Sequence, residues 1–416
     1  MKTKHGLAAA AALALLAGCS GGGGGGGPAE TAVGPAEPVD ITSLVRLSAT
    51  GETDPGQPVT VSAEQGGLLT DVTVIGADGR LLPGELTADQ RSWRSTGPLR
   101  AGSTYRVLVL ADDGKGGRGG TTRQFTTAPA THLLTAELGP DSSGSGIYGV
   151  GQPLTVKLSE KVEDPAARQE VERGLRVVSE PATTGAWYWV DSRTLHFRPK
   201  EYWPANATVR LTYDNQGRHV AGDLYGGETV TRTLRTGDRV EVTVDAGTHY
   251  LTYRRNGVEE RSIPITTGKP GFSTRNGVKV VLGQESLVRM NGESIGIREG
   301  SSEAYDLQVK WATRVTWSGE YVHAAPWSVG SQGRENVSHG CTGMSTENAK
   351  WFYEQTRIGD VVQVVNSRGD DMEPFGNGFG DWNVHWDQYV QHSALGKPVS
   401  TAAPTTQVAG AAPQIG

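Results

Sequence analysis

Cysteine is scarce in this chain: 416 residues contain only two, Cys19 and Cys341. The apolar run that precedes Cys19, Leu7 to Leu16, is too short for the roughly 20 residues of a membrane-spanning helix. No basic stripe is present, and the net charge is −6, so the composition argues against a nucleic-acid partner. The remaining cysteine lies in "SHGCTGM", Ser338 to Met344, between two glycine-containing pairs.

The N-terminus predicts export. Lys2 and Lys4 precede the apolar run, and "LAGC" ends it at Cys19, which is typical of a secretory signal over residues 1–18. "LAGC" resembles the bacterial lipobox, in which the cysteine becomes the lipidated first residue; the alternative is a plain signal peptide with an incidental cysteine. The glycine-rich stretch that follows, residues 19–40, predicts a flexible linker. We therefore expect a protein anchored by lipid to the outer face of the cell membrane.

The fold class is predicted to be mainly β. Short β-branched runs separated by Gly, Pro, Asn and Asp extend from about residue 41 to 237. "GQPVTV" at Gly56 recurs as "GQPLTV" at Gly151, an internal repeat about one small sandwich long. We predict two Ig-like β-sandwiches, residues 41–130 and 131–237, the second with a helical insertion at Pro165 to Gly174.

A third, mostly-β domain is predicted over residues 238–366. It contains a hairpin signal at Asn256–Gly257, a short helix from Ser345 to Arg357 and a buried strand from Asp360 to Val365. A Trp-rich C-terminal extension, residues 367–396, is expected to pack on this domain. Residues 397–416 are rich in Ala, Pro, Thr and Gln, which predicts a disordered tail.

Cys341 is a candidate nucleophile, and a buried structural cysteine is the alternative reading. A thiol with a pKa of about 8.5 needs a base or a cation nearby to act as thiolate. His339 is too close along the chain to turn back to the sulfur easily, whereas His323 can approach from a neighbouring strand. We predict His323 as the base and give His339 a supporting role. The sequence leaves open whether His323 stabilises a resting thiolate or takes the proton only during attack.

The glycines around the thiol allow backbone amides near Gly340 to point at a developing oxyanion; an ordinary turn is the alternative. Zinc binding is a competing reading, but structural zinc sites use paired ligands two to four residues apart. That spacing is missing among the candidate ligands, which are His323, His339, Cys341, His385 and His392. We predict no metal and no cofactor.

Residues 323–365, "HAAPWSVGSQGRENVSHGCTGMSTENAKWFYEQTRIGDVVQVV", resemble the catalytic core of the L,D-transpeptidases, the YkuD family. "GDWNVHWDQY", Gly380 to Tyr389, resembles the C-terminal extension of the mycobacterial and related actinobacterial members, which also carry Ig-like domains and an anchored N-terminus. The resemblance implies an acyltransferase that forms 3→3 peptidoglycan cross-links through a cysteine thioester. It implies two partners, the donor and acceptor stem peptides, and covalent inhibition by β-lactams of the carbapenem class.

The same resemblance implies residue roles: Cys341 is the nucleophile, His323 the general base and acid, and Gly340 an oxyanion-hole amide. Ala324, where many members have Ser, would orient His323 through its backbone carbonyl. Many members have Asn where this chain has Gly343, so a side-chain role is lost there.

Four residues are candidates for substrate binding: Tyr305 in a segment resembling a lid, Trp327, Ser338 and Gly343. Packing is the alternative for the aromatic residues, and especially for Trp327 and Trp382. Two other functions remain open: an L,D-carboxypeptidase of the same fold and a non-catalytic wall-binding lipoprotein.

Overall fold

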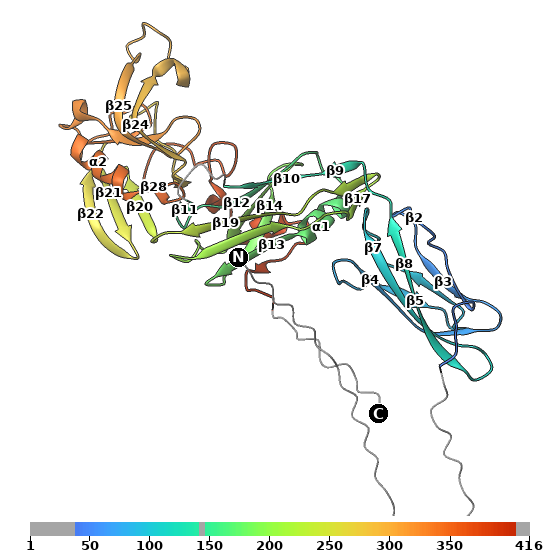
Figure 1. Ribbon diagram of the computed structural model, residues 1–416. Coiled ribbons are helices and arrows are strands. Elements are labelled where there is room, and N and C mark those ends of the chain that lie inside the picture. The colour runs from blue at the N-terminus through green and yellow to red at the C-terminus, as the bar shows by residue number, and fades with distance from the viewer. Residues whose placement is uncertain (1–37, 141–145, 405–416) are drawn as a thin grey trace, which may run out of the picture.

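The computed structural model describes residues 38–140 and 146–404. Cys19, the predicted signal and most of the predicted linker lie outside these residues. Three bodies follow one another along an elongated molecule, with the N-terminal sandwich at one end and the third domain at the other (Figure 1). Within the described ranges, no helix is both long enough and apolar enough to cross a membrane.

The first body is a sandwich of two four-stranded sheets around its own core. In its longest buried strand alternate residues face inward, as a half-buried strand requires. One sheet has the order β1 (Val45–Leu47), β3 (Thr60–Ala63), β6 (Ser92–Ser95), β5 (Gly84–Leu86). The other has the order β2 (Glu52–Thr53), β8 (Arg118–Thr127), β7 (Thr104–Asp112), β4 (Leu68–Gly76).

The second body is a larger sandwich whose core contains Trp187, Phe197 and Trp203. Its first sheet has the order β10 (Ala136–Gly139), β12 (Leu154–Leu158), β15 (Thr194–Pro199), β14 (Thr184–Trp189), β29 (Val399–Ser400). Its second has the order β11 (Ile147–Tyr148), β19 (Val230–Thr236), β16 (Thr208–Tyr213), β13 (Leu175–Glu180). A small third sheet has the order β17 (His219–Ala221), β18 (Leu224–Gly226), β9 (His132–Leu134).

The helical insertion of this sandwich is confirmed as α1 (Pro165–Gly174). Asp164 caps it by accepting a hydrogen bond from the amide of Ala167, and Pro165 occupies its first turn, where a missing N–H costs nothing.

The third body consists of two sheets around a separate core. One has the order β22 (Val258–Pro264), β21 (Tyr250–Arg255), β20 (Val240–Asp245), β28 (Val361–Val365), β23 (Gly277–Val280). The other has the order β24 (Gly283–Asn291), β25 (Asp306–Arg314), β26 (Tyr321–Ala324), β27 (Thr342–Met344). The β24–β25 hairpin projects from the end of the molecule (Figure 1), and its tip carries the 3-10 helix η1 (Gly292–Ile295).

Three sequence predictions for this body are confirmed. The Asn256–Gly257 pair joins β21 to β22 with positive φ at both residues, as a tight hairpin turn requires. The predicted helix is α2 (Thr346–Gln355), capped by the side chain of Ser345. The predicted buried strand is β28.

The C-terminal segment corrects two expectations. Its helical turns, η3 (Asp381–Asn383) and α3 (Trp386–Gln391), pack against the second sandwich as well as the third body. The predicted disordered tail, 397–416, is ordered as far as residue 404, and 405–416 lie outside the described residues. Composition misled here because β29 is held by the edge of β14, and the buried Thr401 hydroxyl accepts a hydrogen bond from the amide of Thr183 at 2.7 Å.

Candidate active site

Two parallel strands bring the predicted base and nucleophile together. β26 pairs with β27 so that His323 lies opposite Gly343, and Cys341 stands directly before β27. His323 and Cys341 are 18 positions apart in sequence, but one lies on β26 and the other directly before the neighbouring strand β27. His323 and Cys341 line the same cavity, whose volume is about 270 Å³.

The geometry of His323 fixes its tautomer. Its Nδ1 lies 2.8 Å from the carbonyl oxygen of Ala324, which can only accept, so Nδ1 carries the hydrogen and Nε2 is left with a lone pair. The backbone contact predicted for Ala324 is thus present. Burial lowers the pKa of His323, against the smaller opposing effect of the Ala324 carbonyl. The imidazole is therefore a neutral base at neutral pH.

Cys341 rests as a thiol. Burial raises its pKa to about 11, although the backbone amide of Tyr321 and the charge of Lys279 act in the opposite direction. Its Sγ–H points to the carbonyl oxygen of Gly319 at 3.5 Å. Of the two possibilities left open by the sequence, the structure supports proton transfer during attack, because burial disfavours the charged form of both partners.

A second, larger cavity of about 580 Å³ also reaches Cys341. Tyr305, Met290 and His339 line both cavities and so lie between them. The smaller cavity is bordered by Leu307, Val309 and Trp327 and is mainly apolar. The larger one is lined by three arginines, Arg275, Arg289 and Arg314, but by one carboxylate, that of Glu320. The thiol can therefore be approached from two sides of different polarity.

His339 connects the cysteine loop to the segment directly before β25. Its Nε2 lies 2.7 Å from the carboxylate of Glu303, and its ring packs on Tyr305 at 5.0 Å. Glu303 also accepts from Lys269 at 2.5 Å. Because the carboxylate only accepts, Nε2 is a donor here. This arrangement agrees with a supporting role for His339 rather than a role as the base.

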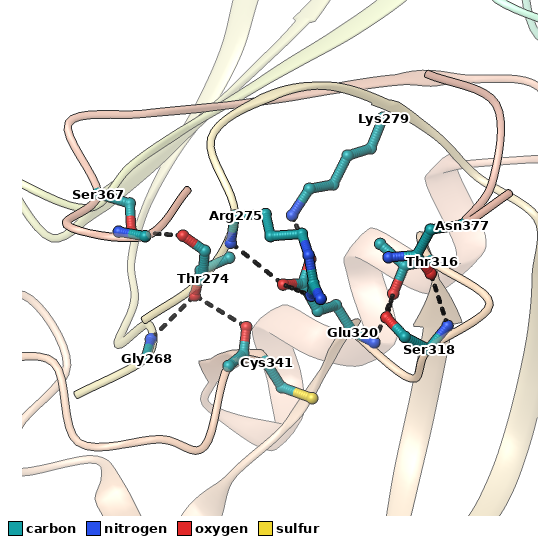
Figure 2. Close-up of polar contacts among 12 residues, drawn as sticks. Gly268, Thr274, Arg275, Lys279, Thr316, Ser318, Glu320, Cys341, Ser367 and Asn377 are labelled. Carbon is teal, nitrogen blue, oxygen red and sulfur yellow. Dashed lines mark hydrogen bonds and ion pairs between the residues drawn. The ribbon is translucent and has the colours of Figure 1, made fainter. Parts of the chain in front are cut away.

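The cysteine loop is braced by its own polar groups. The Ser338 hydroxyl donates to the carbonyl oxygen of Cys341 at 2.6 Å and accepts from the amide of Gly340 at 3.2 Å. Thr274 donates to the carbonyl oxygen of Gly340 at 2.8 Å, which fastens the loop from the other side (Figure 2). The Ser338 hydroxyl, predicted to bind substrate, is thus committed to the loop. The Gly340 amide reaches a substrate oxygen only by giving up its long contact with Ser338.

Glycine is required at two positions of this loop. Gly340 has φ of +119°, a conformation that L side chains rarely adopt. At Gly343 an added Cβ would lie 2.9 Å from the Cβ of Ala325 and 3.2 Å from Thr266. The backbone of Gly343 also exchanges two hydrogen bonds with the backbone of Thr266, at 2.8 and 2.9 Å. Position 343 therefore has no room for a side chain.

The two tryptophans differ in environment. Trp327 is 56% exposed and stands at the cavity beside His323, with 6.2 Å between ring centroids, so the reading of Trp327 as a core residue is wrong. Trp382 donates to the carbonyl oxygen of Gly151 at 3.1 Å and packs on Tyr202 of the second sandwich. Its role is packing, at a junction between bodies.

Sequence reasoning missed a buried ionic cluster near the thiol. Lys279 of β23 is fully buried and pairs with Glu320, which Arg275 also contacts at 3.3 Å (Figure 2). A lysine in a strand is normally expected on the solvent side. The only signal in the sequence was Glu320, an acidic residue three positions before His323 in "GEYVH".

The described residues offer no metal site: no group of three His, Cys, Asp or Glu side chains among them is placed to hold an ion.

Comparison with known proteins gives two family matches. A model described as a bacterial Ig domain matches residues 50–219, spanning both sandwiches. A model described as an L,D-transpeptidase catalytic domain matches residues 239–364, which run from β20 into β28.

Curated relatives agree with the match to the catalytic domain. L,D-transpeptidase 2 of Mycobacterium tuberculosis is 35% identical over 352 residues, covering 84% of this chain and 83% of the relative. L,D-transpeptidase 1 of the same organism is 34% identical, covering 58% of this chain and 92% of the relative. A solved L,D-transpeptidase in complex with imipenem is 36% identical, with a TM-score of 0.47, covering 55% of this chain and 98% of that one.

Proposed function

The chain belongs to the L,D-transpeptidase (YkuD) family, and from this premise we propose that it forms 3→3 cross-links in peptidoglycan through a thioester on Cys341. One observation carries the proposal. Cys341 and His323 line one cavity, and the Ala324 carbonyl holds His323 in the tautomer whose Nε2 can accept a proton.

The first half-reaction makes the thioester. His323 Nε2 takes the thiol proton while Cys341 Sγ attacks the carbonyl carbon of the third residue of a tetrapeptide stem. The tetrahedral intermediate collapses when His323 returns the proton to the nitrogen of the terminal D-Ala, which leaves as the free amino acid. The bond broken is the L,D-peptide bond, and the bond formed is the thioester. Because the resting Cys341 thiol and the His323 imidazole are both neutral, no thiolate–imidazolium ion pair has to be separated before the attack.

The second half-reaction resolves the thioester. The side-chain amine of a second stem attacks the thioester carbon, gives its proton to His323 and forms the new amide. Cys341 leaves as thiolate and recovers the proton from His323. Two approaches to one thiol suit two substrates that must both reach the same carbon. Two arginines of the larger cavity are already paired, Arg289 with Asp306 and Arg275 with Glu320. The third, Arg314, donates to backbone carbonyl oxygens, and its positive charge suits a peptide that carries carboxylates, as stem peptides do.

Incubation with defined tetrapeptide stems, followed by mass spectrometry, tests this proposal. We expect dimers that have lost one D-Ala, and we expect them to be absent with Cys341→Ala and strongly reduced with His323→Ala. Shortened monomers without dimers would instead identify an L,D-carboxypeptidase, in which water resolves the thioester. No conversion of any stem by the folded wild-type chain would favour a non-catalytic wall-binding protein.

Inhibition by carbapenems follows from the same chemistry. The strained lactam carbonyl is an acyl donor, and its opening by Cys341 would leave a thioester that blocks the cavity. We expect one covalent adduct per chain, located on the peptide that contains Cys341. A β-lactam adduct that persists in Cys341→Ala would contradict this assignment.

The location of the protein is part of the proposal. If Cys19 is lipidated, the chain is anchored at the outer face of the cell membrane, with its sandwiches between the anchor and the catalytic domain. The elongated arrangement of the three bodies supports a reach from the membrane into the wall (Figure 1). Metabolic labelling with a fatty-acid analogue, compared between the wild type and Cys19→Ala, tests the anchor.

A further inference from the structure

A buried ammonium group lies near the reacting thiol and has no part in the reaction described above. Lys279 of β23 has no exposed surface, and its Nζ contacts the carboxylate of Glu320. Burying such a pair costs several kcal/mol per ion before their attraction is counted, and breaking it leaves an uncompensated charge. In Figure 2 the Lys279 chain descends to the Glu320 carboxylate, with Arg275 beside it.

Glu320 joins the two backbone groups that hold the sulfur. The preceding residue, Gly319, accepts the hydrogen bond from Cys341 Sγ at 3.5 Å, and the following residue, Tyr321, directs its amide at the same sulfur. The position of the Glu320 backbone therefore decides how the thiol is oriented.

The Glu320 residue is held from several sides. Its carboxylate accepts from the amide of Arg275 at 3.1 Å and lies 3.3 Å from the Arg275 guanidinium, in addition to the Lys279 contact. Its own amide donates to Thr316 Oγ1 at 2.8 Å. Arg275 in turn reaches Glu373 of the C-terminal segment at 3.4 Å. The turn that orients the thiol is thus fixed by a network that includes β23.

The charges around Cys341 come from several elements. His323 and Tyr321 face it from β26, His339 from its own loop, Tyr305 from the residue directly before β25, Glu320 from the turn before β26 and Lys279 from β23. Arg275 and Glu373 lie behind Glu320. Of the two buried ions, the carboxylate disfavours a thiolate at Cys341 and the ammonium favours it. Each therefore offsets the effect of the other on the sulfur.

We propose that Lys279 and Glu320 act as a positioning pair for Cys341. Glu320 orients the Gly319 carbonyl and the Tyr321 amide toward the sulfur. Lys279 anchors this turn through the Glu320 carboxylate, and its positive charge offsets the negative charge of that carboxylate next to the developing thiolate. The relevance of the pair to cross-linking rests on the proposed function. Its effect on the thiol does not, because it concerns the reactivity of Cys341 toward any electrophile.

Alkylation of Cys341 by iodoacetamide, followed on the Cys341 peptide by mass spectrometry across a pH series, tests the pair in the full chain. Lys279→Met leaves Arg275 as the cation that contacts the Glu320 carboxylate and removes the buried ammonium group, so we expect alkylation roughly tenfold slower at a fixed pH, which corresponds to about one unit in the thiol pKa. Glu320→Gln removes the opposing charge and keeps the side-chain shape, so we expect alkylation faster by a similar factor. The double variant should fall between the two.

The opposite signs separate this role from a purely structural one. Loss of packing alone would change the two single variants in the same direction, or would lower their melting midpoints without changing the alkylation profile; either result would overturn the proposal. Lys350→Met on the exposed face of α2 is the matched control and should leave the profile unchanged. If Lys279→Met does not fold, Glu320→Gln decides: faster alkylation supports the pair, and an equal or slower rate refutes it. Because alkylation needs no stem peptide, this outcome does not depend on whether the chain cross-links peptidoglycan.

Discussion

Burial determines the protonation of the two reacting side chains. Desolvation lowers the pKa of His323 from the ordinary value of 6.5, so the imidazole stays unprotonated, and able to accept a proton, throughout the neutral range. We expect kcat/KM for the donor stem, which reports thioester formation, to be level from about pH 8 to about pH 6.5 and to decline only below that, where His323 becomes protonated. A pH series with defined stems measures this. An acidic limb centred above the ordinary histidine value would contradict the assignment of His323.

The reacting pair could be predicted from the sequence, whereas the groups that adjust it could not. Cys341 and His323 stand out because few residue types perform nucleophilic and base chemistry, and because their motif is distinctive. Lys279 and Glu320 belong to no such motif. Their role depends on their burial, and their burial depends on which strands become neighbours. β23 lies near the thiol only because the two sheets pack together. The exposure of Trp327 was misjudged for the same reason.

At the scale of single elements, the β26–β27 pairing depends on a residue without a side chain. An alanine at position 343 would place its Cβ 2.9 Å from Ala325 and 3.2 Å from Thr266, so β27 or its neighbours must move. We expect Gly343→Ala to lower the free energy of unfolding by about 1–3 kcal/mol, as overpacking does, and to reduce cross-linking because Cys341 stands two residues earlier. Urea unfolding and the stem assay measure the two effects.

Gly283→Ala is the matched control for this substitution. Gly283 begins β24 and has open space where its Cβ would be. If Gly343→Ala proved as stable and as active as Gly283→Ala, the close packing around β27 would not be what holds the cysteine loop in place.

Asp360, at the turn that leads from α2 into β28, makes stability depend on pH. Burial raises the pKa of its carboxyl from 3.8 to about 7, although it accepts a hydrogen bond from the amide of Arg357 at 2.8 Å. The folded chain therefore keeps this proton where the unfolded chain has lost it. The contribution to stability is fully present below pH 3.8, decreases by up to about 1.4 kcal/mol per pH unit as the pH rises, and is gone above about pH 7.

Asp360→Asn removes this dependence and keeps an acceptor for the Arg357 amide. We expect the variant to be more stable than the wild type at about pH 8, with an advantage that shrinks as the pH falls through the range between the two pKa values. Urea unfolding at three pH values measures it. Asp370→Asn, on an exposed side chain, should show no such trend. An advantage independent of pH, or a loss of stability at about pH 8, would show that the Asp360 carboxyl is not held protonated.

Some elements could be read from the sequence because their signals are local. The Asp164 and Ser345 caps and the Asn256–Gly257 turn each specify a conformation within a few residues, and all three are present. The C-terminal segment could not be read in this way. β29 is a strand only because β14 offers it an edge, and Thr401 is buried by contacts with residues more than 200 positions away in sequence. No local pattern encodes such partners.

At the scale of the whole molecule, the second sandwich and the catalytic domain form one unit. Backbone hydrogen bonds join Gly149 to Ile358 at 2.8 Å and Gly151 to Gly359 at 2.9 Å, and Val361 belongs to the core of the sandwich. The C-terminal segment then returns to the sandwich. There, the buried Glu172 of α1 accepts from the hydroxyl of Ser393 at 2.7 Å and from the indole of Trp189 at 2.8 Å. The two bodies should therefore unfold together.

The first sandwich is attached differently. Its own core is separate, and polar contacts mark its joint with the second sandwich: Arg80 with Asp214 at 3.0 Å, Arg100 with the Gln216 carbonyl at 2.9 Å, and the Ala101 amide with the Gly217 carbonyl at 2.8 Å. The Arg80–Asp214 ion pair is accessible to solvent. Such pairs contribute little to stability, typically below about 1 kcal/mol each, and are screened by salt. The joint orients the first sandwich without making its stability depend on the neighbour.

Removal of residues 1–130 tests this division. Every group placed at the reacting thiol lies at or beyond Thr266, and β9, the first strand that would remain, keeps its partner β18. We expect the truncated chain to cross-link soluble stems at a rate within about twofold of the full chain, and calorimetry to show one transition fewer with the midpoint of the remaining transition unchanged. A folded truncation that has lost most of its activity would show that the first sandwich shapes the site through the second. The truncated chain could instead convert soluble stems as well as the full chain does but fail on intact wall material. The first sandwich would then act as a spacer, because it sets the distance between the catalytic domain and the start of the chain.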